Sequence, residues 1–252
     1  MTGRLDGRTA LVTGSTSGLG RAVADAFAAE GAHVVLTGRS KEAGERAVAG
    51  LRGAGHRAGF AAADLAEGVP AVTRLAEEAE RLLGGRVDIL VNNAGIVPVG
   101  PTADFDEAAY DRAWTVNVKS AFFLTARLAP AMAARGDGVV INTGSIVVSH
   151  GIAGSALYSA TKAAIESLTM SWSAEYGPQG VRVNTISPGL VLTEGTAPGT
   201  GRVEAMAGAS PAGRPGRAEE IGPLAVYLAS ADAAYVHGST FTLDGGWSTA
   251  RR

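Results

Sequence analysis

Short β-prone runs alternate with longer helix-prone segments along almost the whole of this 252-residue chain. Several of the runs, such as Val34 to Leu36, are apolar at consecutive positions, as expected for strands whose two faces are both covered by helices. This repeated order, with no linker, predicts one doubly wound α/β domain over residues 1–252, with about seven parallel strands flanked by helices on both faces. We expect strands at 9–13, 33–37, 58–63, 87–93, 138–145, 181–187 and 239–243, and helices near 18–30, 41–52, 70–83, 106–134, 157–176 and 218–229.

Two places interrupt this alternation. Pro130 lies inside the long helix expected at 106–134, and it should kink or end that helix because proline has no N–H to donate. Residues 195–217 follow the sixth strand and hold six glycines and three prolines. They form either a plain surface loop or a mobile lid over a ligand, the lid then spanning about 190–217, because ligands of such sheets bind beyond the carboxyl ends of the strands.

The overall composition excludes several classes of function. A formal charge of −2 provides no basic surface, so neither nucleic acid nor an anionic membrane is an expected partner. The absence of cysteine excludes disulfides, thiolate metal sites and cysteine nucleophiles. No apolar run approaches the length of about 18 residues that suggests a membrane span, and the N-terminus does not resemble a cleaved signal. We therefore expect a soluble, cytoplasmic protein.

A glycine-rich segment, TGSTSGLG at residues 13–20, lies between the first expected strand and the first expected helix. Gly14, Gly18 and Gly20 allow the backbone to turn tightly and approach a bulky anion, and amides at the start of the helix would point toward a pyrophosphate. The context predicts a Rossmann-type dinucleotide site, although a glycine-rich turn without a ligand is an alternative. GSTSG also resembles the nucleophile elbow of hydrolases, but threonine replaces the serine and no histidine is placed to complete a triad.

The end of the second expected strand bears on the choice of dinucleotide. An acidic residue there would bind the ribose 2′-hydroxyl of NAD, whereas a cation would accept the 2′-phosphate of NADP. The sequence has Arg39 at this point and no acid before Glu42. Arg39 therefore favours NADP(H), with NAD(H) as the alternative if this arginine is only a solvated surface residue.

The segment YSATK at residues 158–162 places a tyrosine and a lysine four residues apart. The chain has only three lysines and five tyrosines, so about 0.06 such pairs would arise by chance. On a helix, Tyr158 and Lys162 would share one face. A nearby ammonium favours the phenolate, and it would bring the phenol pKa of about 10 closer to neutrality, where proton transfer is efficient. A tyrosine resting on a lysine stem at the surface is the alternative.

Other polar and small residues follow the carboxyl ends of neighbouring expected strands. Ser145 ends the fifth strand, thirteen residues before Tyr158, and Asn92-Asn93-Ala94-Gly95 ends the fourth. Asn117 lies inside a predicted helix, where an amide is a poor helix former. The sixth strand is followed by Pro188, Gly189, Val191 and Thr193.

Together these motifs resemble the short-chain dehydrogenase/reductase family, of the single-domain kind called classical. The resemblance covers essentially the whole chain, from TGSTSGLG through Asp64-Leu65, NNAG, Asn117, Ser145, YSATK and Pro188-Gly189 to Asp244-Gly245-Gly246. It implies an NAD(P)(H)-dependent oxidoreductase that transfers a hydride between nicotinamide and a ketone or secondary alcohol, without a metal. It also implies a homotetramer.

The resemblance implies roles for individual residues. Tyr158 would be the general acid or base, Lys162 would lower its pKa and hold the nicotinamide ribose, Ser145 would bind the substrate oxygen, and Asn117 would support a water-linked proton relay. Asp64 and Leu65 would line the adenine pocket, and Val191 with Thr193 would contact the carboxamide. The full set of implied cofactor-binding residues is Gly14, Ser15, Ser17, Gly18, Leu19, Gly20, Arg39, Asp64, Leu65, Asn92, Ala94, Gly95, Tyr158, Lys162, Pro188, Gly189, Val191 and Thr193.

The substrate is expected to be a small or medium carbonyl compound, secondary alcohol or cyclic polyol. Residues 146–154 and Ile96 should border its pocket, and they are mostly apolar or small; His150 is expected at the surface rather than on the substrate. A 3-oxoacyl-[acyl-carrier-protein] reductase activity is disfavoured, because residues 171–175 offer no basic side chain to an acidic carrier. A non-catalytic dinucleotide-binding regulator is the other alternative, but it would not need Ser145, Tyr158 and Lys162 together.

Overall fold

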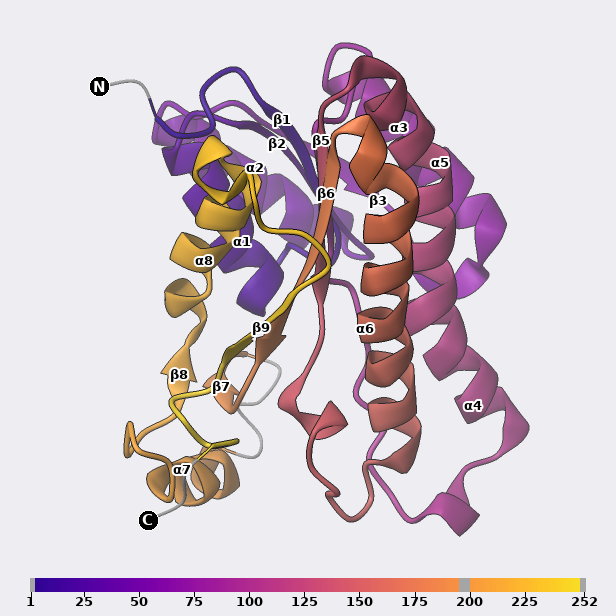
Figure 1. The fold of residues 1–252 in the computed structure, drawn as a ribbon, viewed down its shortest axis with the longest axis vertical. Coiled ribbons are helices and arrows are strands. Elements are labelled where there is room, and N and C mark those ends of the chain that lie inside the picture. The colour runs from indigo at the N-terminus through magenta and orange to yellow at the C-terminus, as the bar shows by residue number, and fades with distance from the viewer. Residues whose placement is uncertain (1–2, 195–199, 250–252) are drawn as a thin grey trace.

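Seven parallel strands form one sheet in the computed structural model of the chain, which describes residues 3–194 and 200–249 (Figure 1). Their spatial order is β3 (Ala58–Ala62), β2 (His33–Gly38), β1 (Thr9–Val12), β4 (Ile89–Asn92), β5 (Gly138–Thr143), β6 (Val181–Pro188) and β9 (Thr240–Leu243). The order reverses between β1 and β4, which pair directly with Ala10 opposite Ile89. In sheets of this kind ligands bind at such a reversal, outside the carboxyl ends of the strands.

Helices cover both faces of the sheet (Figure 1). One face carries α1 (Gly18–Ala29), α2 (Lys41–Gly53) and α8 (Gly222–Ala229), and the other carries α3 (Val69–Leu82), α5 (Ser120–Arg135) and α6 (Ala156–Tyr176). The shorter α4 (Glu107–Trp114) leads into α5. Beyond the carboxyl ends of the strands lie α7 (Thr200–Gly208) and a two-stranded sheet of β7 (Val191–Leu192) and β8 (Gly216–Arg217). Among the described helices, none combines the length and hydropathy needed to cross a membrane.

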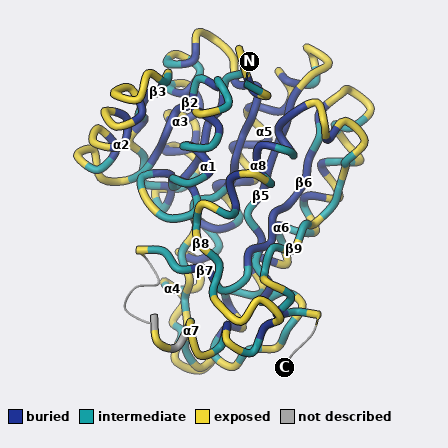
Figure 2. Tube along the Cα trace, turned by 90° about the vertical axis from the view of Figure 1, so that its left-hand side faces the viewer, coloured by how far each residue is buried: buried dark blue, intermediate teal, exposed yellow. Residues whose placement is uncertain are grey.

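Successive residues of a strand contribute to two separate cores, one on each face. Val12 packs in the core that contains Phe27 of α1, whereas its neighbour Leu11 packs in the core that contains Leu75 of α3, and all four side chains are essentially inaccessible. Figure 2 shows the inner strands β1, β2, β4, β5 and β6 as the most continuously buried part of the chain, with exposed residues along the outer helices and around α7. The consecutive apolar residues noted in the sequence are explained by this double coverage.

The structure confirms the predicted fold, and every predicted strand agrees with an observed strand to within two residues at each end. Of the two outcomes expected at Pro130, the helix does not end there, because α5 continues through it to Arg135, and a kink stays a prediction. Pro130 and Ala126, whose carbonyl loses its usual partner, are both exposed, so water can satisfy that carbonyl. The helix is irregular earlier instead, in a π-helical segment η3 (Thr115–Lys119) that contains Asn117.

The glycine-rich segment at 195–217 is more ordered in its second half than expected for a plain loop. It contains α7 and β8, and β8 pairs with β7 through Val191 opposite Gly216. Residues 195–199 lie outside the described residues. The movement of this segment as a lid stays a prediction.

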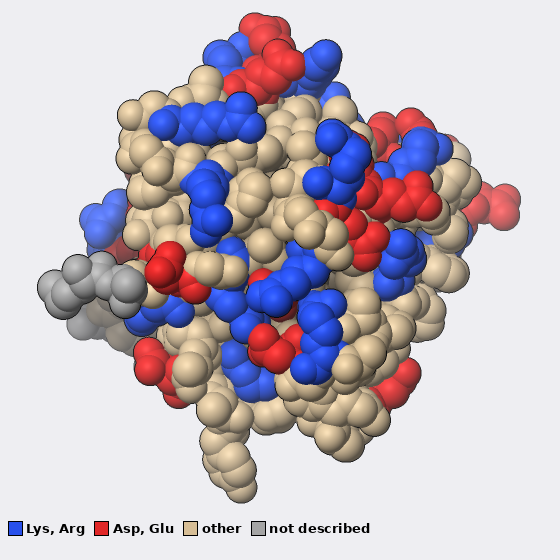
Figure 3. Space-filling model, turned by 90° about the horizontal axis from the view of Figure 1, so that it is seen from above, with Lys and Arg blue, Asp and Glu red and all other residues tan. Residues whose placement is uncertain are grey.

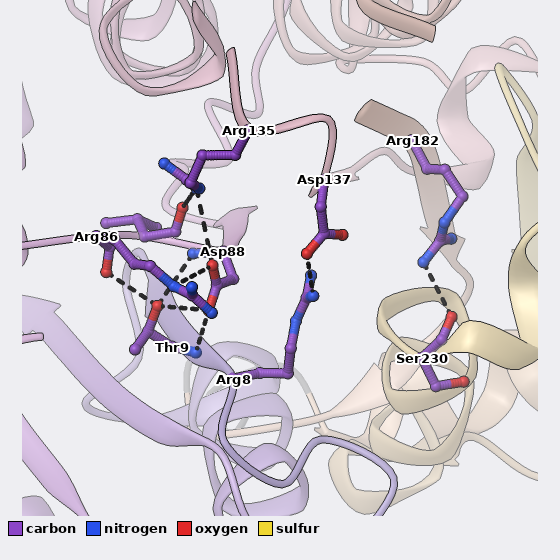
Figure 4. Close-up of polar contacts among 9 residues, drawn as sticks. Arg8, Thr9, Arg86, Asp88, Arg135, Asp137, Arg182 and Ser230 are labelled. Carbon is purple, nitrogen blue, oxygen red and sulfur yellow. Dashed lines mark hydrogen bonds and ion pairs between the residues drawn. The ribbon is translucent and has the colours of Figure 1, made fainter. Parts of the chain in front are cut away.

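The amino ends of the strands carry a network of charged side chains (Figures 3 and 4). Asp88, whose side chain is only 1% exposed, accepts hydrogen bonds from the backbone and hydroxyl of Thr9, both 3.0 Å, and pairs with Arg86 at 2.8 Å. Burial alone would raise the pKa of Asp88. The hydrogen bonds from Thr9 and Arg86 and the positive charge of Arg8 together lower this pKa by more than burial raises it, so it lies below its ordinary value. The network joins β1 to β4 at the end of the sheet farthest from the site described next.

Candidate active site

A cleft of about 500 Å³ opens at the carboxyl ends of the strands, over the reversal between β1 and β4. Most of the residues that the sequence assigned to a cofactor or to catalysis line it. They are Gly14, Ser17, Leu19, Gly20, Arg39, Asp64, Leu65, Ala94, Gly95, Ser145, Tyr158, Lys162, Pro188, Gly189, Val191 and Thr193. They follow the ends of six neighbouring strands, β1 to β6, or lie at the starts of α1 and α6, so the parallel sheet brings them together.

The glycine-rich loop has the backbone that its sequence predicts. Gly14 has φ +62°, and a Cβ at this position would lie 2.9 Å from the Cα of Ala94 in the loop after β4. At Gly20, a Cβ would overlap the carbonyl oxygen of Gly14 and the side-chain amide of Asn93. The loop therefore packs directly on its neighbour, and α1 begins at Gly18 immediately behind it. Free amides at that helix start face the cleft and suit an anionic group.

Four of the assigned residues do not line the cleft: Ser15, Gly18, Asn92 and Asn117. The hydroxyl of Ser15 is fully buried, where it donates to the carbonyl of Val12 at 2.6 Å and accepts from the amide of Thr37 at 3.0 Å. The side chain of Asn92 donates to Asn142 at 2.9 Å in the interior of the sheet. Gly18, at the first turn of α1, has φ +56° and lies against Thr193. Sequence motifs could not separate such supporting residues from those that face a ligand.

Tyr158 and Lys162 lie one helical turn apart near the start of α6. The ammonium of Lys162 is 5.7 Å from the centroid of the Tyr158 ring, and it donates a 2.7 Å hydrogen bond to the carbonyl oxygen of Thr143 at the end of β5. Lys162 is only 4% exposed, so burial lowers the pKa of its ammonium to about 8, while the carboxylate of Glu166 opposes this shift. The lysine is thus held between the helix and the sheet, beside the phenol.

Ser145 and Tyr158 interact through a hydrogen bond between their side chains. Ser145 begins the short 3₁₀ turn η4 (Ile146–Val148) directly after β5, and its hydroxyl also accepts from the amide of Val147 at 3.4 Å. Burial raises the pKa of the Tyr158 phenol above its ordinary value, and a hydrogen bond with Ser145 lowers it in part. The sequence had suggested a phenol pKa lowered by Lys162; in this structure burial outweighs every favourable contact, so the direction is the opposite.

Asn117 lies behind the cleft in the π-helical segment. Its side-chain oxygen accepts from the amide of Ile96 at 2.8 Å, and its side-chain nitrogen donates to the carbonyl of Ile96 at 2.9 Å and to the hydroxyl of Thr161 at 3.0 Å. The extra backbone unit of the π-turn aims the amide at these partners. Asn117 therefore ties the loop after β4 to α6 next to Lys162, and the water-linked relay stays a prediction.

Several residues that line the cleft were not singled out from the sequence. Most adjoin a recognised motif, so the motif could have been extended to include them: Thr16, Thr37, Gly38, Ala63, Val97, Thr143, Gly144 and Leu190. Arg112 of α4, Val116 and Val203 of α7 have no such signal, because only the packing of their helices brings them to the cleft. Ile96 lines it as expected, and His150 packs its ring edge-on against Trp247 at 5.1 Å.

Known proteins resemble this chain over its whole length. A family model described as enoyl-(acyl carrier protein) reductase matches residues 14–248. A solved structure of a protein described as a short chain dehydrogenase/reductase family protein is 44% identical, covers 98% of this chain and 100% of its own, and superimposes with a TM-score of 0.90. The chain belongs to the short-chain dehydrogenase/reductase family. Membership confirms the predicted family and the predicted class of enzyme.

Two further relatives of this short-chain dehydrogenase/reductase have named activities. The galactitol 2-dehydrogenase (L-tagatose-forming) of Cereibacter sphaeroides is 38% identical over 97% of this chain and 96% of its own length. The structure of a gluconate 5-dehydrogenase from Burkholderia cenocepacia J2315, solved in complex with NADP and tartrate, is 34% identical and covers 98% of this chain and 97% of its own, with a TM-score of 0.91. The relatives thus include enzymes that act on polyhydroxylated compounds.

The cleft fits the dinucleotide that this family implies. The glycine-rich loop at the start of α1 would hold the pyrophosphate, since its close backbone approach leaves no room for side chains. Asp64 and Leu65 line one part of the cleft, and Ser145, Tyr158 and Lys162 line another. Among the described residues, no group of three or more histidine or acidic side chains could hold a metal ion.

Proposed function

We propose that this short-chain dehydrogenase/reductase transfers a hydride between NADP(H) and a small or medium-sized secondary alcohol or ketone, with Tyr158 as the acid and base. The observation that carries the proposal is the meeting of Ser145, Tyr158 and Lys162 in the cleft that contains the glycine-rich loop. A protein that only binds a dinucleotide needs the loop, but it has no use for a phenol, a hydroxyl and a buried ammonium beside it.

The three side chains have distinct tasks in this proposal. The nicotinamide cofactor, when bound, supplies or accepts the hydride at the carbon that bears the substrate oxygen. Ser145 holds that oxygen by a hydrogen bond, and the Tyr158 hydroxyl gives its proton to it when a ketone is reduced. When an alcohol is oxidised, the phenolate takes the proton back. The Lys162 ammonium, anchored on the carbonyl of Thr143, stabilises the phenolate, and the positive charge of an oxidised nicotinamide would add to this effect.

The preference for NADP(H) rests on Arg39 and on the position of the nearest acid. Arg39 lines the cleft directly after β2, where it is exposed, and no ion pair to it occurs within the described residues. Glu42, the first acidic residue after β2, pairs instead with Arg46 on the surface of α2 and does not line the cleft. A guanidinium with no ion pair among the described residues suits a 2′-phosphate, whereas the loop after β2 brings no carboxylate into the cleft for a 2′-hydroxyl.

The substrate class rests on the lining of the cleft beside Tyr158. Ile96, Val97, Leu190 and Val203 line part of the cleft with apolar side chains, which suits a compact molecule. Polyols and cyclic alcohols are the first compounds to examine, since the relatives include a galactitol dehydrogenase. A carrier-bound acyl substrate is disfavoured, because α6 has no lysine or arginine after Lys162 with which to meet an acidic carrier protein.

We also propose that the enzyme works as a homotetramer. Phe122 and Phe123 of α5 are 42% and 38% exposed, and the Phe122 ring lies 6.0 Å from that of Trp172 on α6. The two phenylalanine rings also pack edge-to-face, 5.4 Å apart, and form an exposed aromatic surface on α5. Aromatic groups exposed in this way typically mark contacts between subunits.

A spectrophotometric screen tests the proposed function. Purified protein is mixed with NADPH or NADH and a panel of ketones, and with NADP or NAD and the corresponding polyols and cyclic alcohols, while absorbance at the nicotinamide band is followed. Turnover that requires Tyr158 supports the proposal. Tight cofactor binding with no turnover across the panel would instead support a regulator that only binds the dinucleotide.

A further inference from the structure

A third ionisable side chain continues the row formed by Tyr158 and Lys162. Glu166 lies one more turn along α6, so the phenol, the ammonium and the carboxylate repeat every four residues on one face of the helix. Glu166 is partly buried rather than solvated, and no role in the proposed reaction uses it. Partial burial of a carboxylate costs free energy, so a glutamate at this position, next to a buried lysine, suggests a function.

The Glu166 carboxylate contacts residues near the ends of β5 and β6. Its Oε1 atom accepts a 3.2 Å hydrogen bond from the hydroxyl of Ser187 near the end of β6. The same oxygen lies 2.9 Å from where a Cβ would stand at Gly144, and the Thr185 methyl lies 2.8 Å from that point. Any residue other than glycine at position 144, directly before Ser145, would push the carboxylate away. The absence of a side chain at Gly144 therefore leaves the space that the Glu166 carboxylate occupies.

Lys162 has few other charges around it. Tyr158 and Glu166 face it from its own helix. The groups from the elements packed against it are neutral: the Thr143 carbonyl at the end of β5, Ser145 in the following turn, Asn117 of η3 and Ser187 of β6. Within the described residues, Glu166 is the one carboxylate that acts on the Lys162 ammonium, and the two groups form no direct ion pair.

We propose that Glu166 is a positioning residue for the reaction: seated by Ser187 and Gly144, its carboxylate keeps the buried Lys162 in the charged form that Tyr158 requires. The proposal rests on the proposed function, because only hydride transfer with Tyr158 as the acid and base gives the charge of Lys162 a purpose. Its effect is transmitted through Lys162, so Glu166 need not touch the substrate or the cofactor.

The charge of Lys162 can be followed in the free protein. Labelling with lysine carrying ¹³C at Cε gives three signals, because the chain contains only Lys41, Lys119 and Lys162. The first two are exposed and serve as internal references. A titration in the Tyr158→Phe background removes the phenol's own ionisation from the curve. The variants are Glu166→Gln, which keeps the shape and loses the charge, Glu166→Asp, which keeps the charge, and Glu175→Gln, which removes an exposed carboxylate from the same helix.

The expected result is a midpoint of Lys162 that falls by about one pH unit in Glu166→Gln, lies closer to its original value in Glu166→Asp and is unchanged in Glu175→Gln. The alkaline limb of turnover, measured with Tyr158 present, should move to lower pH by a similar amount. Ser187→Ala provides a second route: without this hydrogen bond the carboxylate is no longer held in place next to Lys162, so the Lys162 midpoint should fall in the same direction. This variant decides the question if Glu166→Gln does not fold.

Either of two results would overturn the inference. The Lys162 midpoint could stay in place in both Glu166→Gln and Ser187→Ala, or the lost turnover of Glu166→Gln could be the same at every pH, which would make Glu166 a purely structural support for Gly144. Failure of the proposed function looks different. It would leave the wild-type protein without turnover, while the lysine titration in the free protein still reports whether Glu166 controls that charge.

Discussion

The ammonium of Lys162 lies 5.7 Å from the ring centroid of Tyr158 and 2.7 Å from the carbonyl oxygen of Thr143. Tyr158 and Lys162 both belong to α6, but the Lys162 ammonium is anchored to the sheet through the end of β5. Thr143 ends β5, and Ser145 follows it by two residues, so one strand end fixes both the lysine and the serine. The catalytic arrangement depends on how α6 packs against β5.

The glycine-rich loop should tolerate no side chain at position 20. In Gly20→Ala the added Cβ overlaps the Gly14 carbonyl and the Asn93 amide, so the loop must shift and its amides lose their alignment. We expect NADPH affinity to fall by at least about tenfold, which corresponds to the loss of about one charge-assisted hydrogen bond. Fluorescence titration measures it. Gly53→Ala, at the end of α2 with open space around it, is the control and should bind as the wild type does.

Arg39 should decide between the two nicotinamide cofactors. Arg39→Ala removes the guanidinium proposed to hold the 2′-phosphate, so NADPH affinity should fall by about 10- to 100-fold while NADH affinity changes little. Dissociation constants for both cofactors provide the measurement. Arg46→Ala removes an arginine of the same helical region that is paired with Glu42 and does not line the cleft. An equal loss of affinity for both cofactors in Arg39→Ala would show that this arginine does not read the phosphate.

Asp88 should stabilise the fold in a pH-dependent way. The pKa of its carboxyl is lower in the folded protein, so its contribution is fully present above the unfolded-state pKa of about 4 and is lost as the pH falls through the lower folded value. Asp88→Asn should cost about 2–3 kcal/mol at pH 7, because it leaves Arg86 and Thr9 poorly matched. Urea denaturation at pH 7 and below pH 4 tests this, and the difference from the wild type should shrink at the lower pH.

The control for Asp88 is Asp137→Asn, at a 55% exposed side chain paired with Arg8 in the same network. Exposed ion pairs contribute little, so this variant should lose less than about 1 kcal/mol. If both variants lost the same amount, the buried position of Asp88 would have no special importance.

The aromatic surface on α5 should control assembly. Replacing Phe122 and Phe123 with aspartate places two charges where a subunit contact is proposed, so the protein should elute as a smaller species with a lower mass by light scattering. Val69→Asp changes an apolar residue of α3 that is 37% exposed and outside this surface, and it should leave the mass unchanged. A mass that stays the same in the double variant would place the subunit contact elsewhere.

The sequence predicted the sheet well because a strand with two buried faces leaves a clear apolar run, as at Val34–Leu36. It predicted the positions of Ser145, Tyr158 and Lys162 because their spacing reports which strand ends and helix face they occupy. It could not decide whether the helix ends at Pro130, because this depends on the exposure of Ala126 and so on tertiary packing. It also failed for the Tyr158 pKa, because burial cannot be read from the spacing of two residues.

The side chains behind the cleft were equally hidden from the sequence. Glu166 gave no signal, since a glutamate in a helix is ordinary, and only the structure brings it to Ser187 and Gly144. Arg112 reaches the cleft because α4 packs against α6. Local patterns fix which residues share an element, whereas the packing of elements decides which residues meet.

Turnover of Tyr158→Phe, measured beside its cofactor affinity, tests the central claim most directly. We expect NADPH to bind within about threefold of the wild-type affinity, since the ring remains, while the rate of ketone reduction falls by about 10²- to 10⁴-fold for want of a proton donor. A variant that binds NADPH and reduces the ketone at the wild-type rate would contradict the account.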